Sequence, residues 1–152
     1  MTIRSLGSQG RVFSVKVEEG EKVHEALARL AEDQDISLAI VSGIGGFSRA
    51  VIAYYKPEEA TYYTVEVRPP TGFVIEVASL SGNIVRTSKG PSVHLHAVLG
   101  VNPEKTLSGH LVEGVVKPFL ELFVQEVLVG RGEEVNVYSH RESFEASYRP
   151  YG

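Results

Sequence analysis

Residues 90–121 read GPSVHLHAVLGVNPEKTLSGHLVEGVVKPFLE, and this stretch contains three of the five histidines in the chain. Successive side chains of a β-strand point to opposite faces, so His94 and His96 share one face and Leu95 lies on the other. The turn-forming residues between 100 and 108 predict a hairpin whose second strand carries His110. If the two strands pair, His110 comes alongside the first two histidines.

Three converging imidazoles match the protein half of an open zinc site, in which a fourth position is left for water or another ligand. The chain has no cysteine, so its metal ligands must be histidine, aspartate or glutamate. We therefore predict that His94, His96 and His110 bind zinc or another divalent transition metal. The alternative is that the histidines only line a polar groove.

The length and composition indicate one globular domain. The chain has 152 residues, of which 43% are hydrophobic and 22% charged. We expect a single domain over residues 1–152, with a core at about 11–138 and an irregular C-terminal tail. No apolar run approaches the roughly 20 residues of a membrane span, and the N-terminus lacks the apolar segment of a signal peptide. These features predict a cytoplasmic protein without membrane association.

The charge pattern argues against direct nucleic-acid binding. The formal net charge is −4, and the lysines and arginines are scattered along the chain. Proteins that bind nucleic acids use clustered basic residues to neutralise phosphates. We therefore expect no autonomous DNA binding.

One amphipathic helix is predicted near the N-terminus, over residues 21–34. Its apolar residues recur at helical spacing: Val23, Ala26, Leu27, Leu30 and Ala31. His24 is expected on its solvated side. Most of the remaining chain has strand character, and the expected strands are 11–17, 37–46, 47–55, 61–67 and 73–80.

The strand pattern after residue 80 contains several breaks. A tight turn is expected at Ser81-Gly82-Asn83, before the chain returns toward the histidine hairpin. Pro118 is expected to split residues 112–130 into two strands, with a helix over 117–128 as the competing interpretation. A last short strand is expected at 134–138, followed by a tail that contains His140, a weak site candidate.

The helix does not alternate with the strands, which predicts an α+β fold: a mainly antiparallel β-sheet with one N-terminal amphipathic helix packed on it. Gly43, Gly45 and Gly46 resemble a phosphate-binding loop only superficially, since no Gly-Lys-Ser/Thr follows. Glycines at these positions instead favour a bulge or a close backbone approach.

Two carboxylates are the candidates for a catalytic role. Glu76 and Glu121 each lie in an otherwise apolar strand. Such a carboxylate either lies on a solvated face or belongs to a site, where it could act as a metal ligand, a partner of a ligand or a general base. Arg49, Arg68 and Arg86 are candidates for holding an anionic substrate, and the sequence does not discriminate among them.

Several short motifs resemble the plant and prokaryote conserved (PPC) domain family, in its stand-alone prokaryotic form. They occur in order over about four-fifths of the chain. They are Ser42-Gly43-Ile44-Gly45-Gly46, Glu76-Val77-Ala78-Ser79-Leu80-Ser81-Gly82, Gly90-Pro91-Ser92-Val93-His94-Leu95-His96, Ser108-Gly109-His110-Leu111 and Glu121.

The resemblance implies an α+β protein that assembles as a homotrimer, and it implicates His94, His96 and His110 in metal binding. In the plant proteins the domain is joined to an AT-hook, but Arg131-Gly132 is followed here by Glu133 and not by the Arg-Pro of the hook. The DNA-binding label of the family therefore does not transfer. The architecture is also similar to acetolactate decarboxylase, which holds zinc through a His-x-His pair and a third histidine.

Two hypotheses follow for the function. The first is a homotrimeric metal-binding protein, with zinc at the three histidines and a small-molecule ligand or substrate at the open position. The alternative is a non-catalytic assembly or regulatory module that is associated with DNA only through partners.

Overall fold

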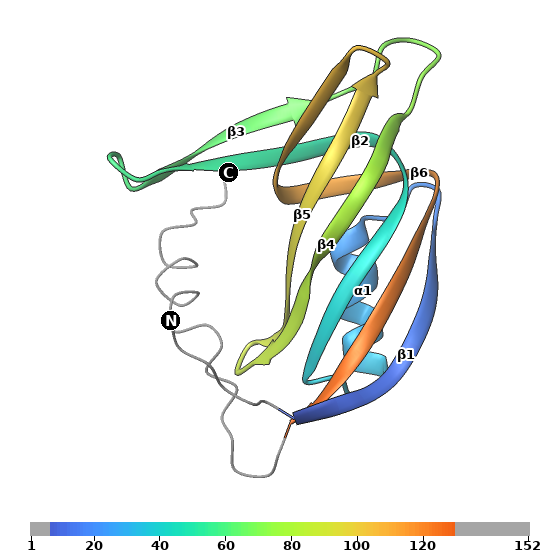
Figure 1. Cartoon of the computed structure of the whole chain (residues 1–152), viewed down its shortest axis with the longest axis vertical. Coiled ribbons are helices and arrows are strands. Elements are labelled where there is room, and N and C mark those ends of the chain that lie inside the picture. The colour runs from blue at the N-terminus through green and yellow to red at the C-terminus, as the bar shows by residue number, and fades with distance from the viewer. Residues whose placement is uncertain (1–6, 130–152) are drawn as a thin grey trace.

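The computed structural model describes residues 7–129, which form one helix and six strands in a strongly curved sheet (Figure 1). The elements in chain order are β1 (Gly7–Glu18), α1 (Val23–Asp33), β2 (Leu38–Lys56), β3 (Thr61–Val67), β4 (Ile75–Thr87), β5 (Gly90–Asn102) and β6 (Lys105–Val129). All strand pairs are antiparallel. The expected α+β class, with an antiparallel sheet and one N-terminal helix, is confirmed.

The sheet closes on itself. The strand order is β1-β6-β5-β4-β2-β3, and β6 also pairs with β2. The four strands β2, β4, β5 and β6 therefore form a closed ring of neighbours, whereas β1 and β3 extend it. The long strands β2 and β6 bend so that each contributes to two parts of the sheet, as Figure 1 shows.

The helix α1 packs inside this curved sheet, against β5 and β6. Its buried residues are Val23, Ala26, Leu27 and Ala31, which confirms the predicted apolar side of the helix. They join alternate residues of the strands in a single apolar core that includes Phe47, Leu95, Leu99, Leu111 and Leu120. At 11 residues α1 is far too short to span a membrane, and the described part of the chain offers no other candidate helix.

Two expected strands, 37–46 and 47–55, are a single strand, β2. The glycines between them bend the strand without ending it. The register with β4 shifts between Gly43 and Gly45, and Gly45 has a φ of 145° that disfavours other residues. A Cβ on Gly43 would lie 2.4 Å from the backbone oxygen of Glu121. The glycines thus permit a β-bulge and the close approach of another backbone, as the sequence predicts.

The expected turn at Ser81-Gly82-Asn83 is wrong, because β4 runs through it from Ile75 to Thr87. Gly82 is paired on both sides, with Val41 of β2 and Leu95 of β5. A Cβ at this position would lie 1.9 Å from the backbone oxygen of His94. Gly82 therefore permits close packing of two strands, and the chain reverses later, at Thr87–Gly90.

The expected break at Pro118 is also wrong, as is the competing helix, because β6 continues from Lys105 to Val129. Proline lacks the N–H that a ladder requires, and it is tolerated in a sheet at irregular positions. Pro118 lies where the pairing with β2 shifts, between Val116 and Leu120. The predicted strand 134–138, the tail and His140 lie outside the described residues.

Candidate metal centre

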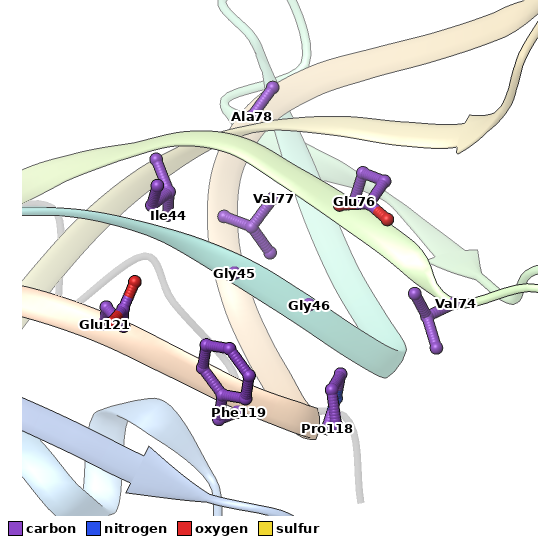
Figure 2. Close-up of a pocket in the computed structure, with 10 residues that line it drawn as sticks. All are labelled: Ile44, Gly45, Gly46, Val74, Glu76, Val77, Ala78, Pro118, Phe119 and Glu121. Atoms are coloured by element: carbon purple, nitrogen blue, oxygen red, sulfur yellow. The ribbon is translucent and has the colours of Figure 1, made fainter.

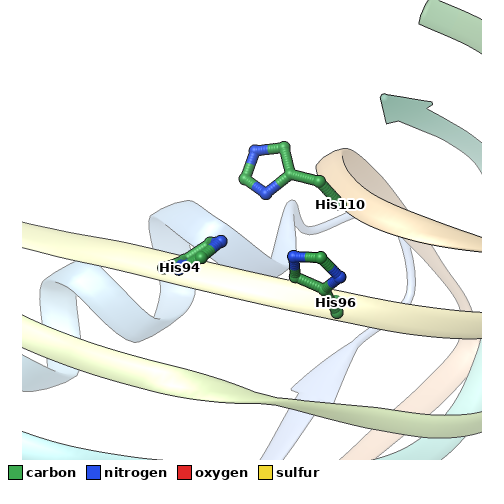
Figure 3. Close-up of side chains that lie close together, drawn as sticks. All are labelled: His94, His96 and His110. Atoms are coloured by element: carbon green, nitrogen blue, oxygen red, sulfur yellow. The ribbon is translucent and has the colours of Figure 1, made fainter. Parts of the chain in front are cut away.

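The three histidines of the 90–121 stretch converge on one face of the sheet. His94 and His96 project from β5, and His110 of β6 is directly opposite His96 in the β5–β6 ladder. The distances between ring centroids are 5.2 Å for His94–His96, 5.0 Å for His94–His110 and 5.5 Å for His96–His110. Figure 3 shows the three rings around a common point. The predicted hairpin and the predicted convergence are both present.

The core side of the hairpin fixes this arrangement. Leu95, Ala97 and Leu99 of β5 are buried, and so is Leu111 of β6. A slip of one residue in either strand would move these apolar side chains to the outer face, so the register is strongly specified. The histidines occupy the alternate positions, where His94 and His110 are half-buried and His96 is exposed.

The three side chains fit a metal ion with only a small contraction. One ring nitrogen from each histidine can be chosen so that the three atoms all lie within 4.8 Å of one another. Nitrogens bound to one tetrahedral zinc at about 2.0–2.1 Å lie roughly 3.4 Å apart. The nitrogens would therefore have to come at most about 1.4 Å closer to bind one ion.

An aromatic residue that the sequence did not single out lies beside this cluster. Tyr62 of β3 is 9% exposed, and its ring centroid is 6.4 Å from that of His110. Tyr55 of β2 packs against Tyr62 with ring centroids 5.2 Å apart. The only signal in the sequence is a tyrosine-rich pair of strands, and nothing in it relates these strands to the histidines.

The carboxylates of Glu76 and Glu121 lie elsewhere, on either side of a pocket of about 500 Å³ between β4, β2 and β6 (Figure 2). Gly45 and Gly46 lie between them. Ser81 is opposite His96 in the β4–β5 ladder, whereas Glu76 is opposite Gly100. At about 3.3 Å per residue, Glu76 is roughly 16 Å farther along β4. The two carboxylates thus line one pocket, and the structure does not bring them to the histidines.

The three candidate arginines are engaged in ion pairs. Arg49 pairs with Glu66 and Glu113, Arg68 pairs with Glu66, and Arg86 pairs with Glu32 and Asp35. Hydrogen bonds from Lys22 and Arg49 hold the pKa of Glu113 below its ordinary value, although partial burial acts in the opposite direction. All three arginines thus pair with carboxylates of the same chain.

His24 lies outside the cluster, on α1. The sequence predicts a solvated side chain, but His24 is half-buried. It lies next to the buried face formed by Val23 and Leu27. Within residues 7–129, the three clustered histidines are the only group of three or more His, Cys, Asp or Glu side chains suited to a metal ion.

Several solved structures are similar to this chain in sequence and fold. A comparison with curated proteins found no match. Among solved structures, a plant- and prokaryote-conserved (PPC) protein from Pyrococcus horikoshii has a TM-score of 0.76 and 30% identity, over 88% of this chain and 92% of that chain. A protein from Archaeoglobus fulgidus described as metal-containing has a TM-score of 0.75 and 28% identity, over 85% of this chain and 87% of that chain.

A more distant similarity confirms the expected architectural relation to acetolactate decarboxylase. The Bacillus subtilis enzyme has a TM-score of 0.55 and 12% identity, over 76% of this chain and 52% of that chain, so the likeness concerns the fold alone.

The sequence model of the Plants and Prokaryotes Conserved (PCC) domain matches residues 4–128. The chain therefore belongs to the Plants and Prokaryotes Conserved domain family.

Proposed function

We propose that this protein is a cytoplasmic homotrimer that binds one zinc ion, or another divalent transition metal, per subunit through His94, His96 and His110. The observation that carries the proposal is the convergence of three imidazoles from two paired strands. The related protein from Archaeoglobus fulgidus, described as metal-containing, supports it. The chain offers no thiolate, and three imidazoles are a donor set suited to zinc.

A metal held by three protein ligands has room for a further ligand, and His96 is exposed to solvent. Such a metal polarises a bound carbonyl or lowers the pKa of bound water. We propose that a small molecule with an oxygen donor binds at this open position. Glu76 and Glu121 are too remote along their strands to serve that ligand within the same subunit.

The outer face of the sheet supports the assembly of several subunits. Large apolar side chains are exposed on it, including Phe123 at 59%, Ile44 at 56% and Ile40 at 54%. Phe123 is opposite Ser42, which lies between Ile40 and Ile44 on β2, so the three side chains are neighbours. An exposed apolar patch of this kind typically marks a protein interface. One cross-strand row on this face runs from Val12 through Gln125, Ile40 and Asn83 to His94. The proposed subunit interface and the proposed metal site are therefore neighbours on one surface.

We further propose that the protein does not bind DNA directly. The net charge of −4 opposes an approach to phosphates. Arg11, Lys22, Arg29, Arg49, Lys56, Arg68 and Arg86 form ion pairs with carboxylates of the same chain. Basic residues that are already neutralised contribute little to counterion release. A fluorescence polarisation titration with duplex DNA should show no salt-dependent binding at physiological ionic strength.

The test of the metal site is elemental analysis of untagged protein purified without chelator, with its mass measured by light scattering. About one zinc per subunit in a trimer is the expected result. Protein that is free of metal and takes up neither zinc nor cobalt on titration would refute the site. A trimeric mass in that case would leave assembly as the function of the domain.

A further inference from the structure

Asn83 lies directly beside the histidine cluster, on the strand that precedes it. It is opposite His94 in the β4–β5 ladder and opposite Ile40 in the β2–β4 ladder. Residues directly opposite each other in an antiparallel pair point to the same face, with their Cβ atoms about 4.5–5.5 Å apart. The Asn83 side chain thus shares the outer face with the His94 ring and lies within its reach.

The side-chain oxygen of Asn83 is buried, and no donor among the described residues forms a hydrogen bond with it. A buried carbonyl without a donor is costly, and most buried polar groups in proteins are paired. Leucine has the same branching at Cγ, so side-chain shape alone does not require an amide here. The acceptor therefore calls for a donor beyond those that the described residues present to it.

A metal-bound histidine provides such a donor. The ring nitrogen that does not bind the metal carries a proton, and it usually donates this proton to a carboxylate, a carbonyl oxygen or water. We propose that Asn83 is a positioning residue of the metal site, whose side-chain oxygen accepts the N–H of His94 when a metal is bound. This inference rests on the proposed function. The hydrogen bond would fix the tautomer and the orientation of the His94 ring.

The cross-strand neighbours of His96 and His110 have no side-chain carbonyl group. His96 is opposite the exposed Ser81 on β4, and His110 is opposite Ala53 on β2. Of these cross-strand neighbours, Asn83 alone has an amide carbonyl, and its oxygen is removed from solvent. A hydrogen bond shielded from water is stronger than an exposed one, so orientation by this carbonyl applies to His94 in particular.

The experiment compares zinc affinity among variants of the full-length protein. Asn83→Leu keeps the branched shape but removes the acceptor, and Asn83→Ala removes the acceptor without adding bulk. Both should bind zinc about ten- to one hundredfold more weakly than the wild type in competition with a chromophoric chelator. Asn83→Asp keeps an acceptor and should bind at least as tightly as the wild type. Ser79→Ala, at an exposed position on the same strand, is the matched control and should bind normally.

Two further readouts separate positioning from a purely structural role. Without metal, Asn83→Leu should melt no lower than the wild type, because a buried unpaired acceptor has been replaced by an apolar group. In the zinc-loaded protein, nitrogen–proton NMR spectra should show a slowly exchanging ring N–H of His94 in the wild type and in Asn83→Asp. This signal should be lost in Asn83→Leu and Asn83→Ala.

Unchanged zinc affinity in both Asn83→Leu and Asn83→Ala would overturn the role of Asn83 while leaving the metal site intact. Equal weakening in Asn83→Asp would also overturn it, because an acceptor would then not be what matters. A change in the coordination number of bound cobalt in Asn83→Asp, read from its visible absorption, would make residue 83 a ligand and overturn the positioning role. A wild type that binds no zinc would instead refute the proposed function, and this inference with it.

Discussion

His96 and His110 are directly opposite each other in the β5–β6 ladder, with ring centroids 5.5 Å apart. They are separated by 13 intervening residues, and the hairpin between them determines their distance. His94 joins them because it is two residues before His96 on the same face of β5. A single pairing register is therefore enough to assemble all three proposed ligands.

Removing one ligand should abolish tight metal binding. We expect His94→Ala and His110→Ala each to lose bound zinc while retaining the trimer, since both rings lie on the outer face and contribute little to the core. Elemental analysis with light scattering measures both properties. His24→Ala, on α1, is the control and should retain the metal. Full zinc occupancy in both ligand variants would exclude the three-histidine site.

The close approach of β4 and β5 should be indispensable for the site. Gly82→Ala places a Cβ 1.9 Å from the backbone oxygen of His94, so the strands must separate at that point. We expect the free energy of unfolding to fall by about 1–3 kcal/mol, as for other overpacked positions, and zinc to bind more weakly. Urea denaturation and zinc titration measure these effects.

Gly100→Ala is the matched control for this change. Its Cβ would lie 3.4 Å from the Cβ of Glu76, an ordinary van der Waals contact across the same pair of strands. Normal zinc binding by this variant would show that an added methyl group between β4 and β5 is harmful only beside His94. Equal effects of the two substitutions would argue against a specific role of Gly82.

A charge on the exposed apolar face should dissociate the proposed trimer. Phe123 is 59% exposed within one subunit, so Phe123→Asp should fold normally but disfavour burial at an interface. We expect the mass from light scattering to fall to that of a monomer, with an unchanged circular dichroism spectrum. Lys105→Asp, near the tip of the β5–β6 hairpin, also adds negative charge and should remain trimeric. A trimeric Phe123→Asp would place the interface elsewhere.

The ion pair between the half-exposed Arg11 and the buried Glu126 should make stability depend on pH. Glu126 is 6% exposed and accepts hydrogen bonds from the side chain and the backbone N–H of Arg11. The hydrogen bonds from the Arg11 side chain lower the pKa of Glu126 and outweigh the opposing effect of burial. At neutral pH, Glu126→Gln should reduce the free energy of unfolding by about 1.5–3 kcal/mol.

The sign of this pH effect follows from the lowered pKa. The stabilisation is fully present above the unfolded-state pKa of about 4.3, and it is lost as the pH falls through the lower folded-state value. The difference between wild type and Glu126→Gln should therefore shrink in acid. Glu59→Gln breaks an exposed ion pair with Lys56 and should change stability little at any pH. A pH-independent difference for Glu126→Gln would contradict the assignment.

Much of the proposed metal site could be predicted from local sequence pattern. Alternation around Leu95 places His94 and His96 on one face, and a short turn-rich segment returns His110 beside them. The helix could be predicted for the same reason, since its apolar spacing has a single consistent period. In each case the information is contained within about 20 residues of sequence, and the core burial of alternate residues enforces it.

Two predicted interruptions of strands were wrong, because residue types that are typical of turns have a different role inside this sheet. Gly82 and Pro118 are strong turn or breaker signals, yet both lie inside long strands. Gly82 is needed because another backbone is close to it, and Pro118 is tolerated because the ladder is irregular beside it. Neither condition is visible without the partner strand.

The sequence by itself determined the strand alternation, the amphipathic helix and the set of residues available as metal ligands. Only the tertiary structure decided that β6 pairs with β2 to close the sheet, that Glu76 and Glu121 line one pocket away from the histidines, and that Asn83 lies beside His94. The physical reason is the distance along the sequence over which each feature is determined. Side-chain periodicity is a property of a few consecutive residues, whereas the neighbours of a residue across a sheet depend on how distant strands pair, curve and close.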